Sequence, residues 1–184
     1  VRAFGHQARG VRLVVKVSNG ERDPAALQRL RALAADVPSI QLIEGYLDRP
    51  TLATLLDSVD AFVSLHRAEG FGLVIAEAMA RGKVVVATDW SGNTDFMSAH
   101  NAMPVDFHLV ELQQDDGPYR QGQRWAEPDL DHAARCLRQV AGDAALRQRL
   151  GARARADAQA QLSPSVIGAA QARRLAAIRR QRGL

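Results

Sequence analysis

Residues 69–77 read EGFGLVIAE and place two glutamates, Glu69 and Glu77, eight positions apart around a glycine-containing turn and the start of a helix. The apolar run that precedes them, residues 61–65, is typical of a buried strand. The residues that follow, as far as Arg81, are strong helix formers and end before a glycine. The segment is therefore predicted to run from strand through loop to helix.

The turn has the features of a phosphate-binding loop. Gly70 and Gly72 allow the backbone to approach a ligand closely or to adopt a positive φ. The first N–H groups of a helix lack internal partners and carry a partial positive charge, which suits an anion. Glu77 lies about one turn into the helix and leans toward the helix start, where its carboxylate can accept hydrogen bonds from hydroxyl groups. This combination predicts a ligand with a diphosphate and sugar hydroxyls, namely a nucleotide sugar.

The motifs resemble those of the retaining GT-B glycosyltransferases of family 4, or group 1. Residues 69–77 resemble the E-x7-E signature of that family, and residues 78–88 are similar to its EAMA-x-G-x-PVVA run, with Lys83 in place of proline. Residues 91–95 resemble its GG-x-x-E loop, with serine for the first glycine and aspartate for the glutamate. The resemblance covers essentially the whole chain as the C-terminal, donor-binding domain of such an enzyme.

The resemblance implies an α/β fold with a doubly wound parallel sheet, the Rossmann-like C-terminal half of a GT-B fold. Alternating strand and helix patterns along the chain support the same class. Strands are predicted over residues 11–17, 40–44, 61–66, 84–88 and 101–107. Helices are predicted over residues 24–35 and 50–58, in the EAMA run, and from Asp129, Asp143 and Ser163 onward. The polar interval 111–128 has no clear period and predicts a loop, either over one edge of the cleft or as a passive surface excursion.

The domain organisation is predicted from length and from the resemblance. A chain of 184 residues that is 47% hydrophobic fits one compact unit. We therefore expect residues 1–184 to form a single nucleotide-sugar donor-binding domain, a fragment of a longer two-domain enzyme. Residues 163–184 are expected to form a helix that contacts the N-terminal domain, and without it apolar residues such as Val166 and Leu175 would be exposed. The Arg and Lys that serve the leaving group in this family would precede Val1.

The resemblance also implies roles for the signature residues. Glu77 would accept hydrogen bonds from the ribose hydroxyls of the donor, and its alternative is a carboxylate favoured by the helix dipole. Glu69 is the expected catalytic residue and would contact the transferred sugar, with a cap for the following helix as the alternative. The backbone of Phe71 and Leu73, with the two glycines, would face the diphosphate and the sugar, while the Phe71 ring would pack against the protein.

Three further residues complete the expected donor site. Asn93 follows the strand predicted over residues 84–88, and it either contacts the ligand or stabilises a turn. His66 either hydrogen-bonds the sugar or leaving group or is a satisfied histidine at a strand end. Tyr46 either flanks the base of the nucleotide or packs at the edge of the core.

Composition and motifs argue against several other classes. Asp129 and Asp131 superficially match the metal-binding D-x-D of a different glycosyltransferase fold but stand at a helix start, so they predict a cap and no metal or other cofactor is expected. Cys136 is the single cysteine, which excludes a disulfide within the chain. The chain has a net charge of +4, and many of its arginines lie in predicted helices without interleaved aromatic residues. This pattern argues against nucleic-acid binding. Neither a membrane span nor a signal peptide is visible, so a cytoplasmic location is expected.

The sequence therefore predicts the donor-binding domain of a retaining, hexosyl-type glycosyltransferase. Such an enzyme moves a sugar from a nucleotide-diphosphate sugar to a sugar or glycoconjugate acceptor, often in polysaccharide biosynthesis, and the fragment alone is expected to be inactive. The main alternative is a non-catalytic nucleotide-binding or interaction module of the same fold, and a third is a GT-B-like sugar epimerase. Two-carboxylate glycosidase chemistry is disfavoured, because the second glutamate of the signature would serve the ribose.

Overall fold

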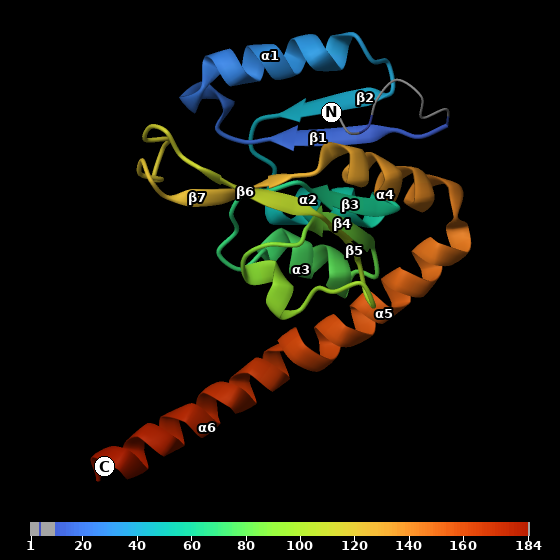
Figure 1. Cartoon of the computed structure of the whole chain (residues 1–184). Coiled ribbons are helices and arrows are strands. Elements are labelled where there is room, and N and C mark those ends of the chain that lie inside the picture. The colour runs from blue at the N-terminus through green and yellow to red at the C-terminus, as the bar shows by residue number, and fades with distance from the viewer. Residues whose placement is uncertain (1–3, 5–9, 184) are drawn as a thin grey trace.

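The computed structural model describes Phe4 and residues 10–183, and Figure 1 shows the arrangement of the elements. The strands are β1 (Leu13–Val17), β2 (Ile40–Glu44), β3 (Ala61–Ser64), β4 (Val84–Thr88), β5 (Met103–Val105), β6 (Phe107–Glu111) and β7 (Arg124–Pro128). The α-helices are α1 (Pro24–Ala35), α2 (Arg49–Ser58), α3 (Leu73–Ala80), α4 (Leu130–Gly142), α5 (Ala144–Leu162) and α6 (Pro164–Arg182). Two short 3₁₀ helices are η1 (Gly20–Arg22) and η2 (Gly92–Asp95).

The parallel strands lie in two sheets. β1 pairs with β2, while β3, β4 and β5 form a three-stranded sheet with β4 at its centre. The predicted α/β class with parallel strands is confirmed, but in the part of the chain that the structure describes no ladder joins β1 to β3. Each of these two strands has one hydrogen-bonded neighbour, and all of their residues are only half-buried.

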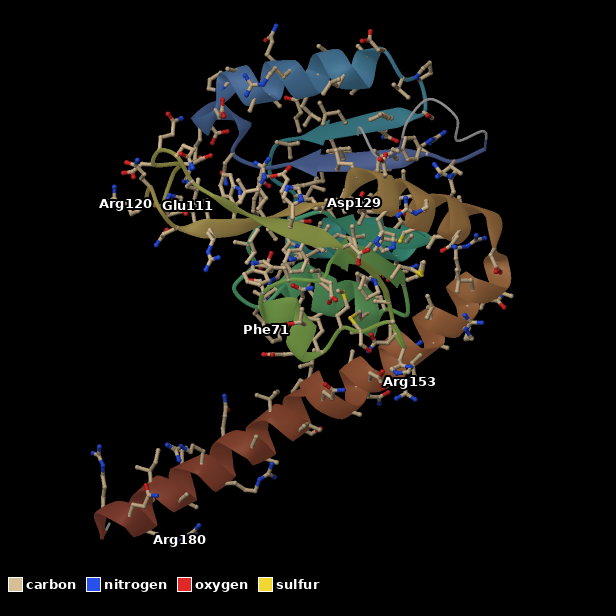
Figure 2. All side chains as sticks on the ribbon, in the orientation of Figure 1. Phe71, Glu111, Arg120, Asp129, Arg153 and Arg180 are labelled. Carbon is tan, nitrogen blue, oxygen red and sulfur yellow. The ribbon has the colours of Figure 1, made fainter. Side chains whose placement is uncertain are left out.

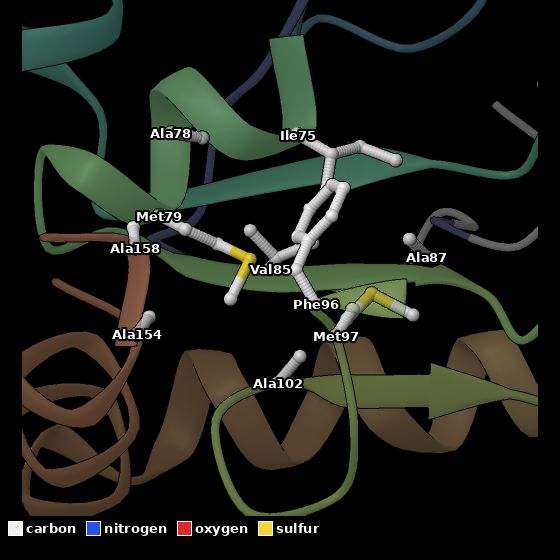
Figure 3. Close-up of a cluster of buried hydrophobic side chains, with 10 residues drawn as sticks. All are labelled: Ile75, Ala78, Met79, Val85, Ala87, Phe96, Met97, Ala102, Ala154 and Ala158. Carbon is white, nitrogen blue, oxygen red and sulfur yellow. The ribbon is translucent and has the colours of Figure 1, made fainter. Parts of the chain in front are cut away.

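β4 is the centre of the larger sheet and is buried along its whole length. Its alternate side chains serve opposite faces, as the two-residue period of a strand requires. Val85 and Ala87 join a cluster with α3 and α5, part of which Figure 3 shows. Val84 and Val86 join a second cluster with α4 and β5. Helices therefore cover both faces of this sheet, which explains why its central strand is a continuous apolar run.

A close contact between two glycines fixes α5 against the end of α3. Gly82 follows α3 with φ +72°, and its N–H and that of Lys83 donate to carbonyl groups in the last turn of the helix. A Cβ at Gly151 in α5 would lie 2.1 Å from the carbonyl oxygen of Gly82. Only glycine at position 151 permits this approach, which brings Ala154 and Ala158 into the core.

The helix starts follow the sequence predictions closely. The carboxylate of Asp129 accepts hydrogen bonds from the N–H groups of Asp131 and His132, both at 2.9 Å, and so caps α4. The carboxylate of Asp143 caps α5 by accepting from Leu146 N at 2.8 Å. The prediction that Asp129 and Asp131 mark a capped helix start therefore agrees with the structure, in which Asp129 is the cap and Asp131 lies in the first turn.

α6 extends away from the rest of the molecule, as Figure 1 shows, and none of its residues is buried. Val166, Ile167 and Leu175 are 38%, 41% and 59% exposed. This agrees with the apolar surface expected on the last helix. None of the helices described by the structure is both long enough and apolar enough to cross a membrane.

The region after β4 differs from the prediction. A single strand was expected over residues 101–107 and a loop over 111–128, whereas β5 is short and β6 pairs with β7 as an antiparallel hairpin. The two short strands stabilise each other, since Phe107 lies opposite Pro128 and Glu111 opposite Arg124. This pairing of distant residues is absent from the local pattern of either segment.

The glycine contact yields a matched pair of variants. Gly151→Ala should lower the free energy of unfolding by about 1–3 kcal/mol, because the new methyl group meets a backbone carbonyl that cannot move freely. Gly168→Ala in α6 adds a methyl group with no atom within 4 Å and should leave stability unchanged or raise it by up to about 1 kcal/mol. Urea unfolding followed by circular dichroism compares the two. Equal destabilisation by both substitutions would contradict the close packing of α5 on α3.

The cap of α4 predicts a dependence on pH. Hydrogen bonds from the backbone N–H of His132 hold the pKa of the Asp129 carboxyl below its ordinary value. The ionised Asp129 carboxylate therefore contributes its full stabilisation above the ordinary pKa, which is that of the unfolded chain. This contribution is lost as the pH falls through the lower pKa of the folded chain. Asp129→Asn keeps an acceptor but does not titrate, so the stability of the native chain relative to this variant should fall between about pH 5 and about pH 2. The midpoints of urea unfolding of the native chain and of Asp129→Asn, taken over this pH range, measure the change. A difference between the two midpoints that stays constant with pH would refute the assignment of Asp129 as the cap of α4.

Candidate functional site

Two loops lie side by side at the carboxyl ends of β3 and β4, residues 65–72 and 89–95. Ligands of open α/β sheets bind at this edge. All of the predicted site residues except Tyr46 lie on these loops or on α3, which begins where the first loop ends. The structure therefore brings most of the predicted residues into one region.

The Ser91 hydroxyl joins the two loops through the backbone of Glu69. Ser91 Oγ donates to the Glu69 carbonyl at 2.7 Å and accepts from Glu69 N–H at 3.2 Å. The N–H of Gly92 donates to the same carbonyl at 3.2 Å. These three bonds form a clamp that sets the position of Glu69 relative to the end of β4. We call them the Ser91 clamp.

The backbone of the second loop is closely constrained at the clamp. Ser91 has φ +79° and ψ −157°, a region that favours glycine. A Cβ at Gly92 would lie 2.2 Å from the carbonyl oxygen of Gly70, so only glycine fits there. Ser91 stands at the position of the first glycine in the GG-x-x-E loop that residues 91–95 resemble. It supplies a hydroxyl group, but its backbone is strained.

His66 provides a second link between the loops. Its Nε2 lies 3.0 Å from the Trp90 carbonyl, and its Nδ1 lies 3.1 Å from Ser64 Oγ. A carbonyl can only accept, so Nε2 carries the proton and Nδ1 accepts from the serine hydroxyl. Both ring nitrogens are engaged, which fits the alternative of a satisfied histidine at a strand end.

The Glu69 side chain is partly engaged at the start of α3. Its Oε1 accepts from Gly72 N–H at 3.1 Å, and Gly72, with φ +88°, is the N-cap residue of the helix. Among the described residues no hydrogen bond involves Oε2, so this oxygen is available to a ligand. Capping and ligand contact are therefore compatible for this carboxylate.

The start of α3 faces solvent. The first helical hydrogen bond runs from Ala76 N to the Gly72 carbonyl at 2.9 Å, so the N–H groups of residues 73–75 precede it and have no partner within the helix. Leu73 is 69% exposed and Glu77 is exposed. Neither Glu69 nor Glu77 takes part in any ion pair among the described residues.

Phe71 and Asn93 have mainly structural surroundings. Phe71 is 40% exposed, so its ring is only partly packed; the contact that it makes is with Phe96, with ring centroids 5.0 Å apart, and Figure 2 labels it. Asn93 is fully buried, and its Nδ2 donates to the Thr88 carbonyl at 3.0 Å. The geometry of Asn93 thus fits the turn-stabilising alternative, because its side chain does not reach the surface.

Tyr46 lies apart from these loops, after β2 and beside Gly45, whose φ is +94°. Its side chain is 84% exposed. The alternative of a tyrosine packed at the edge of the core is therefore wrong, and the ring is free to meet a ligand or another protein surface.

Arg67 was not predicted as a site residue, yet it links the first loop to the β6–β7 hairpin. It donates to both oxygens of Glu127, at 2.7 and 3.1 Å, and its Cζ lies 4.7 Å from the ring centre of Trp125. The hydrogen bonds to Glu127 hold the pKa of the guanidinium above its ordinary value. The Arg67 carbonyl also accepts from Ala126 N at 3.0 Å. No local signal in residues 107–111 or 124–128 pointed to this link, because neither segment alternates apolar and polar residues.

Comparison with protein families agrees with the geometry. The model of the family described as glycosyl transferases group 1 matches residues 1–113, which is more than half of the chain. No curated protein matches the chain.

Several solved structures share the fold of this chain. The Anabaena protein Alr3699/HepE in complex with UDP and glucose shares 19% identity with a TM-score of 0.68, over 95% of this chain and 42% of that one. Sucrose-phosphate synthase from Thermosynechococcus elongatus shares 22% identity with a TM-score of 0.65, over 89% of this chain and 38% of that one. At these identities the likeness shows the fold alone, and the chain spans less than half the length of either protein.

The Ser91 clamp predicts different results for two substitutions of one residue. Ser91→Ala removes the hydroxyl and keeps a side chain in the strained conformation, so it should lower the free energy of unfolding by about 1–3 kcal/mol. Ser91→Gly also removes the hydroxyl but relieves the strain, so its effect should be smaller. Urea denaturation of both variants tests this order. If glycine is the more damaging replacement, the strained geometry of Ser91 is incorrect.

Proposed function

Because the chain belongs to the group 1 glycosyl transferases, we propose that it is the donor-binding domain of an enzyme that transfers a sugar from a nucleotide-diphosphate sugar to an acceptor. The observation that carries this proposal is the solvent-facing start of α3, flanked by Glu69 and Glu77 and held beside the β4 loop by the Ser91 clamp. It combines free amide donors for an anion with carboxylates for hydroxyl groups.

The start of α3 binds the diphosphate in this proposal. The N–H groups of residues 73–75 and the helix dipole favour negative charge, including the charge that develops on the leaving diphosphate as the anomeric bond breaks. Gly70 gives close access to the backbone, because it is exposed and a Cβ there would meet no atom within 4 Å.

The two glutamates bind the polyol parts of the donor. Glu77 is exposed and accepts hydrogen bonds from the ribose hydroxyls. Glu69 uses its free Oε2 for the hydroxyls of the transferred sugar while Oε1 remains on Gly72 N–H. Tyr46 flanks the base, and its exposed ring supports this role. His66 and Asn93 act by positioning the loops, because their polar atoms are engaged or buried.

The complete enzyme, in this proposal, is a retaining hexosyltransferase with a second, N-terminal domain that faces the start of α3. The share of the related structures that this chain covers, 42% of HepE, supports a two-domain arrangement. The exposed apolar residues of α6 support contact between this helix and that domain. A sugar or glycoconjugate acceptor, a role in polysaccharide biosynthesis and a cytoplasmic location complete the proposal.

Nucleotide binding tests the donor-site assignment directly. Isothermal titration calorimetry with UDP, GDP and ADP should detect binding of at least one nucleotide to the 184-residue chain, with little or no sugar transfer. Glu77→Ala should weaken this binding by about ten- to a hundredfold, because hydrogen bonds to a charged acceptor are lost.

Asp36→Ala is the matched control. It removes one exposed carboxylate at the end of α1 and should leave nucleotide affinity unchanged. Failure of the folded chain to bind any of the three nucleotides would reject the donor-site assignment. Equal losses in the two variants would show a general charge effect in place of a ribose contact.

A further inference from the structure

A hollow of about 500 Å³ lies between the loop after β3 and the β6–β7 hairpin. Leu65 and Leu130 contribute apolar surface, while Tyr119 and Trp125 contribute aromatic rings. Arg67, Asp116 and Glu127 supply the charged groups. Its volume falls within the range of small-molecule sites, about 300–1,000 Å³. The hollow borders Ala68, which directly precedes Glu69, but it includes no residue of the 69–77 signature.

One wall of the hollow is held in place by several contacts. Arg67 binds both oxygens of Glu127 and covers the Trp125 ring, and its carbonyl accepts from Ala126 N in the same strand. These interactions fix the guanidinium, the carboxylate and the indole relative to one another. A ligand therefore meets groups whose rotamers are already ordered, which lowers the entropic cost of binding.

The tip of the hairpin forms another part of the lining, and Figure 2 labels Arg120 at this tip. Asp116 and Tyr119 exchange backbone hydrogen bonds at 2.9 and 3.0 Å. The Asp115 carboxylate accepts from Arg120 Nη1 at 2.7 Å and from Gln121 N at 2.9 Å. This closed turn places the Tyr119 ring edge-on to Trp125 with centroids 5.9 Å apart.

The chemistry of the lining favours a neutral polyol. The charge of Arg67 is balanced by Glu127, which leaves the Asp116 carboxylate to repel phosphate and other anions. Arg67 covers one face of the Trp125 ring, so the Tyr119 ring is the aromatic surface on which the C–H face of a pyranose ring can pack. Carboxylate and guanidinium groups hydrogen-bond its hydroxyls.

We propose that this hollow binds a neutral sugar ring of the acceptor, beside the donor site. The assignment rests on the proposed transferase function and deepens it by naming the chemistry of the second substrate. The acceptor is favoured over the transferred sugar because Glu69 and the start of α3, where the donor sugar is placed, lie outside the lining of the hollow.

The chain has two tryptophans, and their fluorescence allows binding in the hollow to be distinguished from binding at the donor site. Trp125 lines the hollow, whereas Trp90 lies on the β4 loop and its carbonyl accepts from His66. Trp90→Phe leaves Trp125 as the single reporter, and Trp125→Phe leaves Trp90. Phenylalanine retains an aromatic ring at each position, and circular dichroism confirms that both variants are folded.

The probes are methyl glycosides of glucose, galactose, mannose, rhamnose and N-acetylglucosamine, added up to about 50 mM to detect millimolar binding. At least one should change Trp125 fluorescence saturably in Trp90→Phe, and saturating UDP should not displace it. The same glycoside should give a saturation-transfer signal in the NMR spectrum of the native chain. Absence of both signals for every glycoside overturns the proposal, and displacement by UDP-glucose but not by UDP assigns the hollow to the transferred sugar instead.

Hairpin variants provide a matched comparison. Tyr119→Ala should weaken glycoside binding by about five- to tenfold, through loss of an aromatic contact. Gln121→Ala keeps the backbone bond to Asp115 and should have no effect. If the two substitutions weakened glycoside binding equally, the assignment of the hollow as a sugar site would be contradicted. Glycoside binding without nucleotide binding would leave the hollow intact while refuting the proposed donor site, so the two failures are distinguishable.

Discussion

The hydrogen bonds between Ser91 and the backbone of Glu69 are the constraint on which the site depends. Neighbouring parallel strands deliver their loops to one edge of a sheet, but strand pairing ends before the loops begin. In this chain the pairing of β3 with β4 extends only to Ser64 and Ala87. Beyond that point the Ser91 clamp and the His66–Trp90 bond continue the connection. The start of α3 is thereby held in register with the loop that follows β4.

The same region shows how packing positions a polar site. α3 has buried residues such as Ile75 and Met79 on one side, and its exposed side carries Leu73 and Glu77. The contact of Gly151 with the turn at Gly82 prevents the helix from shifting along α5. The start of α3 therefore faces solvent while the opposite side of the helix is packed into the core.

Local patterns predicted most of the fold because each had a local physical cause. The apolar run at β4 reflects burial on both faces, and Asp129 and Asp143 were identifiable as caps because a carboxylate at a helix start binds the next N–H groups. The hairpin was missed because β6 and β7 stabilise each other across a separation that no local period records. The division of the parallel strands into two sheets was equally inaccessible, since it depends on which strand edges meet. Among the site residues, the pattern placed Glu69 and Glu77 correctly on the loop and helix, but the engagement of His66 and the burial of Asn93 required the tertiary structure.

α6 continues beyond α5 as a rod that projects from the core. Only Ser163, with an extended ψ of 149°, separates α5 from α6. The 19 residues of α6 make a rod about 28 Å long, at 1.5 Å per residue. A rotation of about 10° at this joint displaces the far end by about 5 Å, given that length. The torsion angles of one serine therefore set the position of Arg179, Arg180 and Arg182 relative to the core, to which α6 contributes no buried residue.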